Sequence, residues 1–168
     1  MNIPDTRTPP WLTVARTYLG TREVPGPDTN ATIKRWLRQL GAWWTDDATP
    51  WCGALPAIVM KESGLAYPKQ WYRARAWADW GMPCEPTNGA VAVFERGAAG
   101  HVGFIVGQDH MSRLLVLGGN QGDAVTIAPF SRLRLIACRW PAEPAAAFDF
   151  TGNLPRLANN EQESRNEA

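Results

Sequence analysis

The sequence has few cysteines, only two histidines and no excess of either charge, and each shortage excludes a class of protein. Three cysteines in 168 residues do not make a disulfide framework, which needs a denser and even set. Seventeen basic and sixteen acidic residues give a net charge of +1, so no electrostatic footprint for nucleic acid is present. Because no apolar run reaches about 18 residues, we expect no membrane span. No Cys-x-x-Cys pair or histidine cluster has metal-ligand spacing, so we expect neither a metal nor a cofactor.

The length suits one domain with a core of its own, and we expect a monomer. Residues 1–8 are expected to form a loose leader, and residues 9–150 a single domain. Residues 151–168 are rich in polar and charged side chains near their end, which predicts a disordered tail.

The hydrophobic period changes from helical to strand-like at about residue 89. Apolar residues at helical spacing predict four helices, over 11–19, 33–40, 50–63 and 70–80. Short apolar runs between polar or glycine-rich turns predict five strands, over 90–94, 101–107, 114–117, 124–128 and 133–140. Helices followed by strands indicate an α+β fold, in which N-terminal helices pack on an antiparallel sheet of about five strands arranged as a meander.

One cysteine, Cys52, stands in the first turn of the third predicted helix. Thr49 is expected to cap that helix and Pro50 to occupy its first position. The helix dipole and free N–H groups would then favour the nucleophilic thiolate. The alternative is a small buried hydrophobe. Pro56 lies further along the same predicted helix and, lacking an N–H, predicts a kink.

A histidine and two amides complete a possible catalytic set. His101 opens an apolar strand, and the next strand ends at Asn120 and Gln121. Cysteine, histidine and a polar orienting residue follow in the order that a thiol hydrolase needs. We assign the orienting role to Asn120, with Gln121 as the alternative, although asparagine among glycines is also typical of a turn. His110, the rival base, lies in a predicted turn.

Four other residues have weaker assignments. Cys138 lies within a predicted strand and is taken as structural, and Cys84 lies in a turn and is taken as incidental. Trp51, one of nine tryptophans, lines the substrate groove or anchors the helix in the core. Asp47 meets a cationic group of the substrate or belongs to a solvated loop.

Four blocks occur together in the sequence and in a recognisable order. They are Pro-Trp-Cys-Gly-Ala at 50–54, Gly-Ala-Val-Ala-Val-Phe at 89–94, Gly-His-Val-Gly-Phe-Ile-Val at 100–106 and Leu-Gly-Gly-Asn-Gln at 117–121. Over roughly residues 9–140, the chain resembles the papain-like cell-wall hydrolases of the NlpC and CHAP type. The segment around Leu-Gly-Thr-Arg-Glu also resembles phage-associated members.

The resemblance implies a phage endolysin-like enzyme that cleaves an amide bond of bacterial peptidoglycan, in or next to the stem peptide. It implies catalysis by Cys52, His101 and Asn120, as an endopeptidase or an N-acetylmuramoyl-L-alanine amidase. The alternatives are an amidase toxin delivered by a secretion system and a non-catalytic wall-binding or virion module. Because no apolar signal segment opens the sequence, we expect synthesis in the host cytoplasm. The protein would act in the periplasm or cell wall after release by a separate pore or secretion system.

Overall fold

The computed structural model describes residues 8–143 and 154–158. The described chain begins with helices: α1 (Pro10–Arg16), α2 (Ala31–Gln39), α3 (Ala54–Glu62) and the 3-10 helix η1 (Ala74–Asp79). The fourth predicted helix is therefore shorter and more tightly wound than expected. No helix among the described residues has the length and apolar character that a membrane crossing requires.

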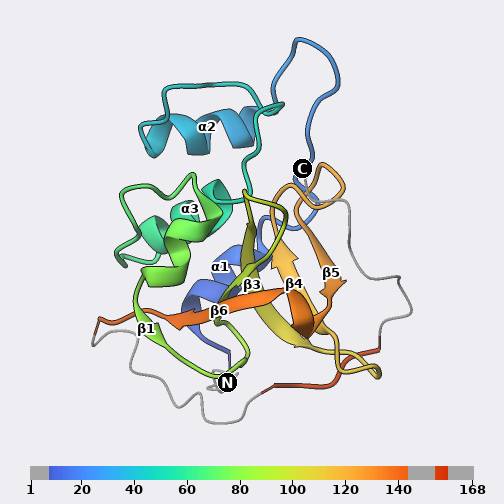
Figure 1. Cartoon of the computed structure of the whole chain (residues 1–168). Helices are drawn as coiled ribbons and strands as arrows, with labels where there is room; N and C mark the ends of the chain where they lie inside the picture. The colour runs from blue at the N-terminus through green and yellow to red at the C-terminus, as the bar shows by residue number, and fades with distance from the viewer. Residues whose placement is uncertain (1–7, 144–153, 159–168) are drawn as a thin grey trace, which may run out of the picture.

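The second half of the described chain forms one six-stranded antiparallel sheet. Its strands are β1 (Met82–Pro83), β2 (Val91–Phe94), β3 (His101–Gln108), β4 (Leu114–Gly118), β5 (Thr126–Phe130) and β6 (Leu135–Trp140), with the 3-10 turn η2 (Arg132–Arg134) before β6. The order across the sheet is β1-β6-β2-β3-β4-β5, and β3, β4 and β5 can be seen side by side in Figure 1. The predicted α+β fold is confirmed.

The sheet differs from the predicted meander at one side. Strands β2 to β5 are neighbours in chain order, but β6 returns to pair with β2, and β1 pairs with the outer edge of β6. The sequence did not reveal β1 because it has only two residues, one of them a proline that cannot donate to the ladder. Strand β3, which begins with His101, therefore lies inside the sheet between β2 and β4.

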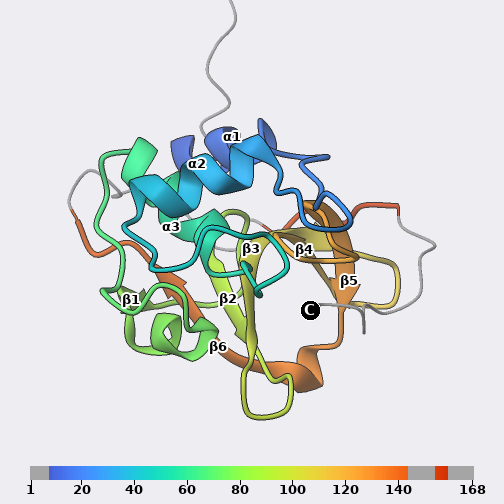
Figure 2. The same ribbon diagram turned by 90° about the horizontal axis from the view of Figure 1, so that it is seen from above.

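The three α-helices lie together on one side of the sheet (Figure 2). Helix α3 contacts α1, α2 and β3, and its first seven residues, Ala54 to Met60, are all buried. A helix that is apolar on every face is typical of such a central position. The start of α3 is thus held in place from several directions.

The reason for predicting a kink at Pro56 does not apply in this helix. Because α3 begins at Ala54, Pro56 is only its third residue. The first N–H groups of a helix have no intrahelical acceptor in any case, so proline removes no helical hydrogen bond there.

Tryptophans supply much of the core. Five are fully buried, and Trp11 also joins α1 to the sheet, since its Nε1–H donates to the Gly89 carbonyl at 2.8 Å. Its ring meets that of Trp140 edge-on, with the centroids 4.9 Å apart. Aromatic pairs of this kind add to the stabilisation from area burial. The fully buried tryptophans are Trp11, Trp36, Trp51, Trp77 and Trp140.

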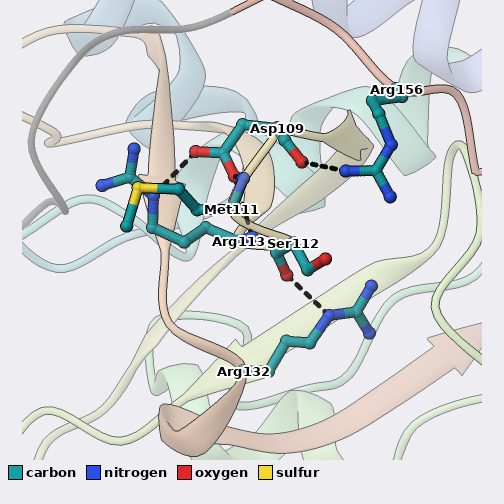
Figure 3. Close-up of polar contacts among 6 residues, drawn as sticks. All are labelled: Asp109, Met111, Ser112, Arg113, Arg132 and Arg156. Carbon is teal, nitrogen blue, oxygen red and sulfur yellow. Dashed lines mark hydrogen bonds and ion pairs between the residues drawn. The ribbon is translucent and has the colours of Figure 1, made fainter.

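Residues 154–158 lie beside the C-terminal end of β3. The Gln108 N–H donates to the Pro155 carbonyl at 2.8 Å. The Arg156 guanidinium donates to the Asp109 carbonyl at 2.7 Å (Figure 3). Strand β2 pairs only with the first four residues of β3, so this returning segment supplies partners that β2 does not reach.

Only parts of the expected leader and tail fall within the residues that the structure describes. The expected disordered tail over 151–168 includes residues 154–158, which are ordered because their backbone hydrogen-bonds to β3. The rest of that tail lies outside the described residues, as do residues 1–7 of the expected leader.

Asp109 organises the turn between β3 and β4 (Figure 3). It is fully buried, and its Oδ1 accepts from the N–H groups of Met111 and Arg113, each at 2.9 Å. Its Oδ2 accepts from Arg113 Nε at 2.7 Å. Burial acts to raise the pKa of Asp109, but the hydrogen bonds and charge of Arg113, with the Met111 N–H, outweigh it and lower that pKa.

We expect Asp109→Asn to lower the free energy of unfolding by about 1–3 kcal/mol at neutral pH, because charge-assisted hydrogen bonds are lost. A carboxyl with a lowered folded pKa stabilises the protein above its unfolded pKa, and this contribution disappears as the pH falls through the folded value. The difference in urea unfolding should therefore shrink below about pH 3.9. Asp79→Asn, at an exposed position, is the control. Equal stability of wild type and Asp109→Asn at neutral pH would contradict this account.

Candidate active site

Cys52 lies in the turn immediately before α3. The helix begins at Ala54 and Gly53 is its N-terminal flanking residue, with φ −73° and ψ −22°. The prediction that Thr49 caps the helix and Pro50 opens it is therefore wrong. Cys52 stands ahead of the helix rather than in its first turn.

A local contact explains why the helix starts late. Thr49 is held by Asp46, whose Oδ1 accepts from the Thr49 N–H at 2.8 Å and from its hydroxyl at 2.9 Å. This local turn competes with the capping role, as is common for short polar side chains. Gly53 passes so close to another loop that a Cβ would lie 2.1 Å from the Trp71 carbonyl oxygen. Only glycine fits beside the cysteine.

The Cys52 thiol is buried, and the groups around it shift its pKa in opposite directions. Only 6% of the Cys52 surface is exposed. Burial raises the pKa of the Cys52 thiol above its usual value, and the Val102 N–H, the Arg96 charge and the Gly53 N–H oppose that rise without cancelling it. The expected preference for thiolate is thus not what the site shows. A thiol of raised pKa is protonated at neutral pH and needs a base beside it.

His101 is the first residue of β3 and is fully buried. The N–H that reaches the Cys52 sulfur belongs to Val102, the next residue along, so the thiol lies at the start of the same strand. On its other side, His101 Nε2 is 2.9 Å from Gln121 Oε1. The structure therefore brings Cys52, His101 and Gln121 together. His110 is exposed beyond the opposite end of β3 and takes no part.

The Gln121 amide is fixed by the sheet. Its Nε2 donates to the Thr126 carbonyl at 3.0 Å and to the Val116 carbonyl at 3.2 Å. With both amide hydrogens committed to carbonyls, Oε1 must be the atom that faces His101. An amide oxygen only accepts, so His101 Nε2 carries the hydrogen and Nδ1 is the basic nitrogen.

Packing holds the imidazole plane. The Phe130 ring stacks on His101 with the centroids 5.3 Å apart and the planes 5° apart. Gly118 leaves room for the hydrogen bond, because a Cβ there would lie 2.0 Å from Gln121 Oε1 and 3.1 Å from His101 Nε2. The sequence offered no signal for Phe130, and the glycines before the amides indicated only a turn.

Asn120, the first choice for the orienting residue, occupies a different position. It is fully buried, with φ +59°, and this left-handed conformation is typical of asparagine in turns. The side chain of the following residue, Gln121, hydrogen-bonds to His101. Of the two amides considered, the geometry favours Gln121 as the orienting residue.

The burial of Trp51 and Asp47 favours structural roles over the suggested substrate contacts. Trp51 is 1% exposed and its Nε1–H donates to Glu23 Oε1 at 2.7 Å, which makes it a core anchor. Asp47 is 2% exposed, and its Oδ2 accepts from the N–H groups of Val24 and Asn30 at 3.0 and 2.8 Å. Its carboxylate therefore fastens the loop before α2.

The accessible space beside Cys52 is a pocket of about 460 Å³. Two segments, 72–75 and 96–100, form most of its wall, and the lining includes three arginines that sequence analysis missed. They are Arg73, Arg75 and Arg96. Among the described residues, no group of histidine, cysteine and acidic side chains could hold a metal ion.

The fold and site define a class: an α+β protein in which a cysteine ahead of a core helix lies beside a histidine that opens a strand, as in thiol hydrolases. Residues 44–120 match the family model of the CHAP domain. The match confirms the resemblance to cell-wall hydrolases of the CHAP and NlpC type over this stretch. It includes Cys52, His101 and Asn120 and ends one residue before Gln121.

This match indicates peptidoglycan hydrolase activity and a peptidoglycan substrate, since CHAP domains are typically cysteine amidases or peptidases. The chain matches no curated protein at a significant level.

The Gln121 contact predicts which nitrogen of His101 carries the proton. We expect nitrogen-15 NMR spectra of neutral His101 to show the Nε2–H tautomer, and Gln121→Ala to shift the population toward Nδ1–H, because the acceptor at Nε2 is lost. Asn120→Ala is the matched comparison and should leave the tautomer unchanged. A shift in Asn120→Ala without one in Gln121→Ala would return the orienting role to Asn120.

Proposed function

We propose that this chain is an endolysin-like peptidoglycan hydrolase that cleaves an amide bond in or next to the stem peptide by thiol catalysis. Cys52 is the nucleophile, His101 the general base and acid, and Gln121 the orienting residue. The observation that carries the proposal is the hydrogen bond from His101 Nε2 to a Gln121 amide that is itself fixed by two sheet carbonyls. This arrangement leaves one imidazole nitrogen basic at the start of β3, where the thiol lies.

The reaction proceeds through a thioester. As the Cys52 sulfur attacks the amide carbonyl, its proton passes to His101 Nδ1. The C–N bond then breaks, and His101 returns the proton to the leaving amine. Backbone N–H groups near Cys52 stabilise the negative oxygen of the tetrahedral intermediate. Water, activated by the same imidazole, hydrolyses the thioester and frees the thiol.

Burial of the thiol supports transfer of the proton during attack rather than before it. The pKa of Cys52 is raised by burial, so the free enzyme holds a neutral thiol at neutral pH. A positioned neutral imidazole then has to accept the proton, and this explains why its tautomer is controlled so closely.

The biological setting that we propose is lysis of a Gram-negative host, with release into the periplasm by a separate pore protein. An amidase toxin would use the same residues and would be accompanied by a neighbouring immunity gene. A non-catalytic wall-binding module would sediment with peptidoglycan without releasing new amines.

The test is digestion of purified Gram-negative peptidoglycan, with the released fragments read by mass spectrometry. We expect the wild type to release fragments with new amines and Cys52→Ala to be slower by at least about 10³-fold, because the nucleophile is lost. Cys84→Ser, which changes a thiol just after β1, is the control and should keep the wild-type rate.

The fragments also identify the bond. Free stem peptides with intact glycan strands mean an amidase, whereas shortened stems mean an endopeptidase. Equal cleavage by wild type and Cys52→Ala, or no cleavage by the wild type, would contradict the proposed function.

A further inference from the structure

The pocket beside Cys52 concentrates positive charge. Its lining includes three arginines and no aspartate or glutamate, although the whole chain carries nearly equal numbers of both signs, with a net charge of +1. This clustering is therefore local to the space through which a substrate reaches the thiol. A pocket with arginines and no acids favours an anionic group.

One of the three arginines has a structural task. Arg75 Nε donates to the Ala98 carbonyl at 3.0 Å, and its Nη2 donates to the Gly97 carbonyl at 2.9 Å. These bonds hold the loop that closes one side of the pocket. Gly100 has a φ of +83°, and a Cβ added there would lie 3.1 Å from the Arg75 side chain. The loop therefore packs closely against Arg75.

The other two arginines present charge to the pocket. Arg96 is half-buried and its charge acts on the Cys52 thiol, whose pKa it lowers against the larger effect of burial. Arg73 is exposed, and its guanidinium lies 6.0 Å from the centroid of the Tyr72 ring, which also lines the pocket. An anionic group that reached both would lie close to the reacting sulfur.

We propose that Arg73 and Arg96 form a carboxylate subsite, and that the enzyme selects amide bonds flanked by a free carboxylate in the stem peptide. Guanidinium groups match carboxylates in charge and planar geometry. In a stem peptide, a γ-linked glutamate leaves its α-carboxylate free next to the amide. The inference rests on the proposed hydrolase function and narrows its substrate. Stems in which that carboxylate is amidated become poor substrates.

The test compares two synthetic stem peptides that differ only in a free carboxylate or a carboxamide beside the scissile γ-amide. We expect the wild type to favour the carboxylate peptide in kcat/KM by about 10- to 100-fold, the range for charge-assisted hydrogen bonds. In Arg73→Gln and Arg96→Gln this ratio should fall toward one. Arg38→Gln, at an exposed position of α2, is the matched control and should keep the wild-type ratio.

The outcomes separate this proposal from the proposed function. Cleavage of both peptides with equal kcat/KM, or a ratio unchanged in both arginine variants, overturns the subsite while the hydrolase stands. If neither peptide is cleaved, calorimetric binding of the same pair to Cys52→Ala decides independently. Tighter binding of the carboxylate peptide supports the subsite even then, and equal or absent binding overturns it.

A second, independent observation concerns the other two cysteines. The pairing of Pro83 with Arg139 places Cys84 opposite Cys138 where β1 meets β6, and the Cys84 N–H donates to the Cys138 carbonyl at 3.1 Å. The two side chains also hydrogen-bond to each other. Opposite residues of antiparallel strands have Cα atoms about 4.5–5.5 Å apart, within the range for a disulfide. Both thiols are free in this structure.

We infer that Cys84 and Cys138 form a disulfide when the protein meets a disulfide oxidant, such as glutathione disulfide. The Cys84 thiolate attacks the oxidant and displaces one thiol, and Cys138 then displaces the second, so the protein pair loses two electrons and two protons. The hydrogen bond from Cys138 lowers the pKa of Cys84, which makes it the attacking thiol. The bond would fasten the two-residue strand β1 to the sheet.

Oxidation of the native full chain with glutathione disulfide tests this inference. We expect the free thiols to fall from three to one, with Cys52 the survivor and a single cross-linked peptide containing Cys84 and Cys138 in the mass spectrum. The midpoint of urea unfolding should rise, because the cross-link restricts the unfolded chain. Cys84→Ser should gain neither the cross-link nor the added stability. Three titratable thiols after oxidation, or a cross-link that includes Cys52, would overturn it.

Discussion

The hydrogen bond between Gln121 Oε1 and His101 Nε2 is the interaction on which the site depends. In this hydrogen bond His101 is the donor and Gln121 the acceptor, because the Gln121 amide hydrogens already bond to the carbonyls of Val116 in β4 and Thr126 in β5. The pairing of those two strands therefore decides which imidazole nitrogen is basic. The Gln121 side chain is thus held by the sheet, and a fixed orientation of this kind is what the proposed role of His101 as a base requires.

The Cys52 thiol is controlled by burial rather than by a hydrogen bond, because its surroundings disfavour the charged thiolate. Cys52 stands before α3, shielded from water, and burial raises its pKa although the Val102 N–H and the Arg96 charge act against that rise. A neutral buried thiol is stable but unreactive. In the proposed mechanism, a neutral Cys52 thiol can attack only if a base of fixed tautomer lies close by. The burial of Cys52 therefore makes the fixed tautomer of His101 necessary.

The assignment of catalysis to Cys52 and His101 came from their order along the chain and stays a prediction. The α+β class could be predicted from sequence, because hydrophobic periodicity carries that information. The choice between Asn120 and Gln121 could not, since adjacent amides are equivalent in composition. It depends on where two sheet carbonyls lie in space. The start of α3 was predicted wrongly for a local reason: Thr49 hydrogen-bonds to Asp46 instead of capping the helix. Likewise, the burial that makes Trp51 a core anchor comes from contacts between distant segments.

The arginines beside Cys52 connect substrate choice to the protonation of the thiol. The charge of Arg96 by itself favours the thiolate. A substrate carboxylate bound there neutralises much of that charge, so binding an anion raises the cost of ionising Cys52. A mechanism based on a preformed thiolate would therefore be weakened by its own substrate. A neutral thiol that gives its proton to His101 during attack avoids this conflict, because no isolated negative charge has to exist on sulfur beside the bound carboxylate.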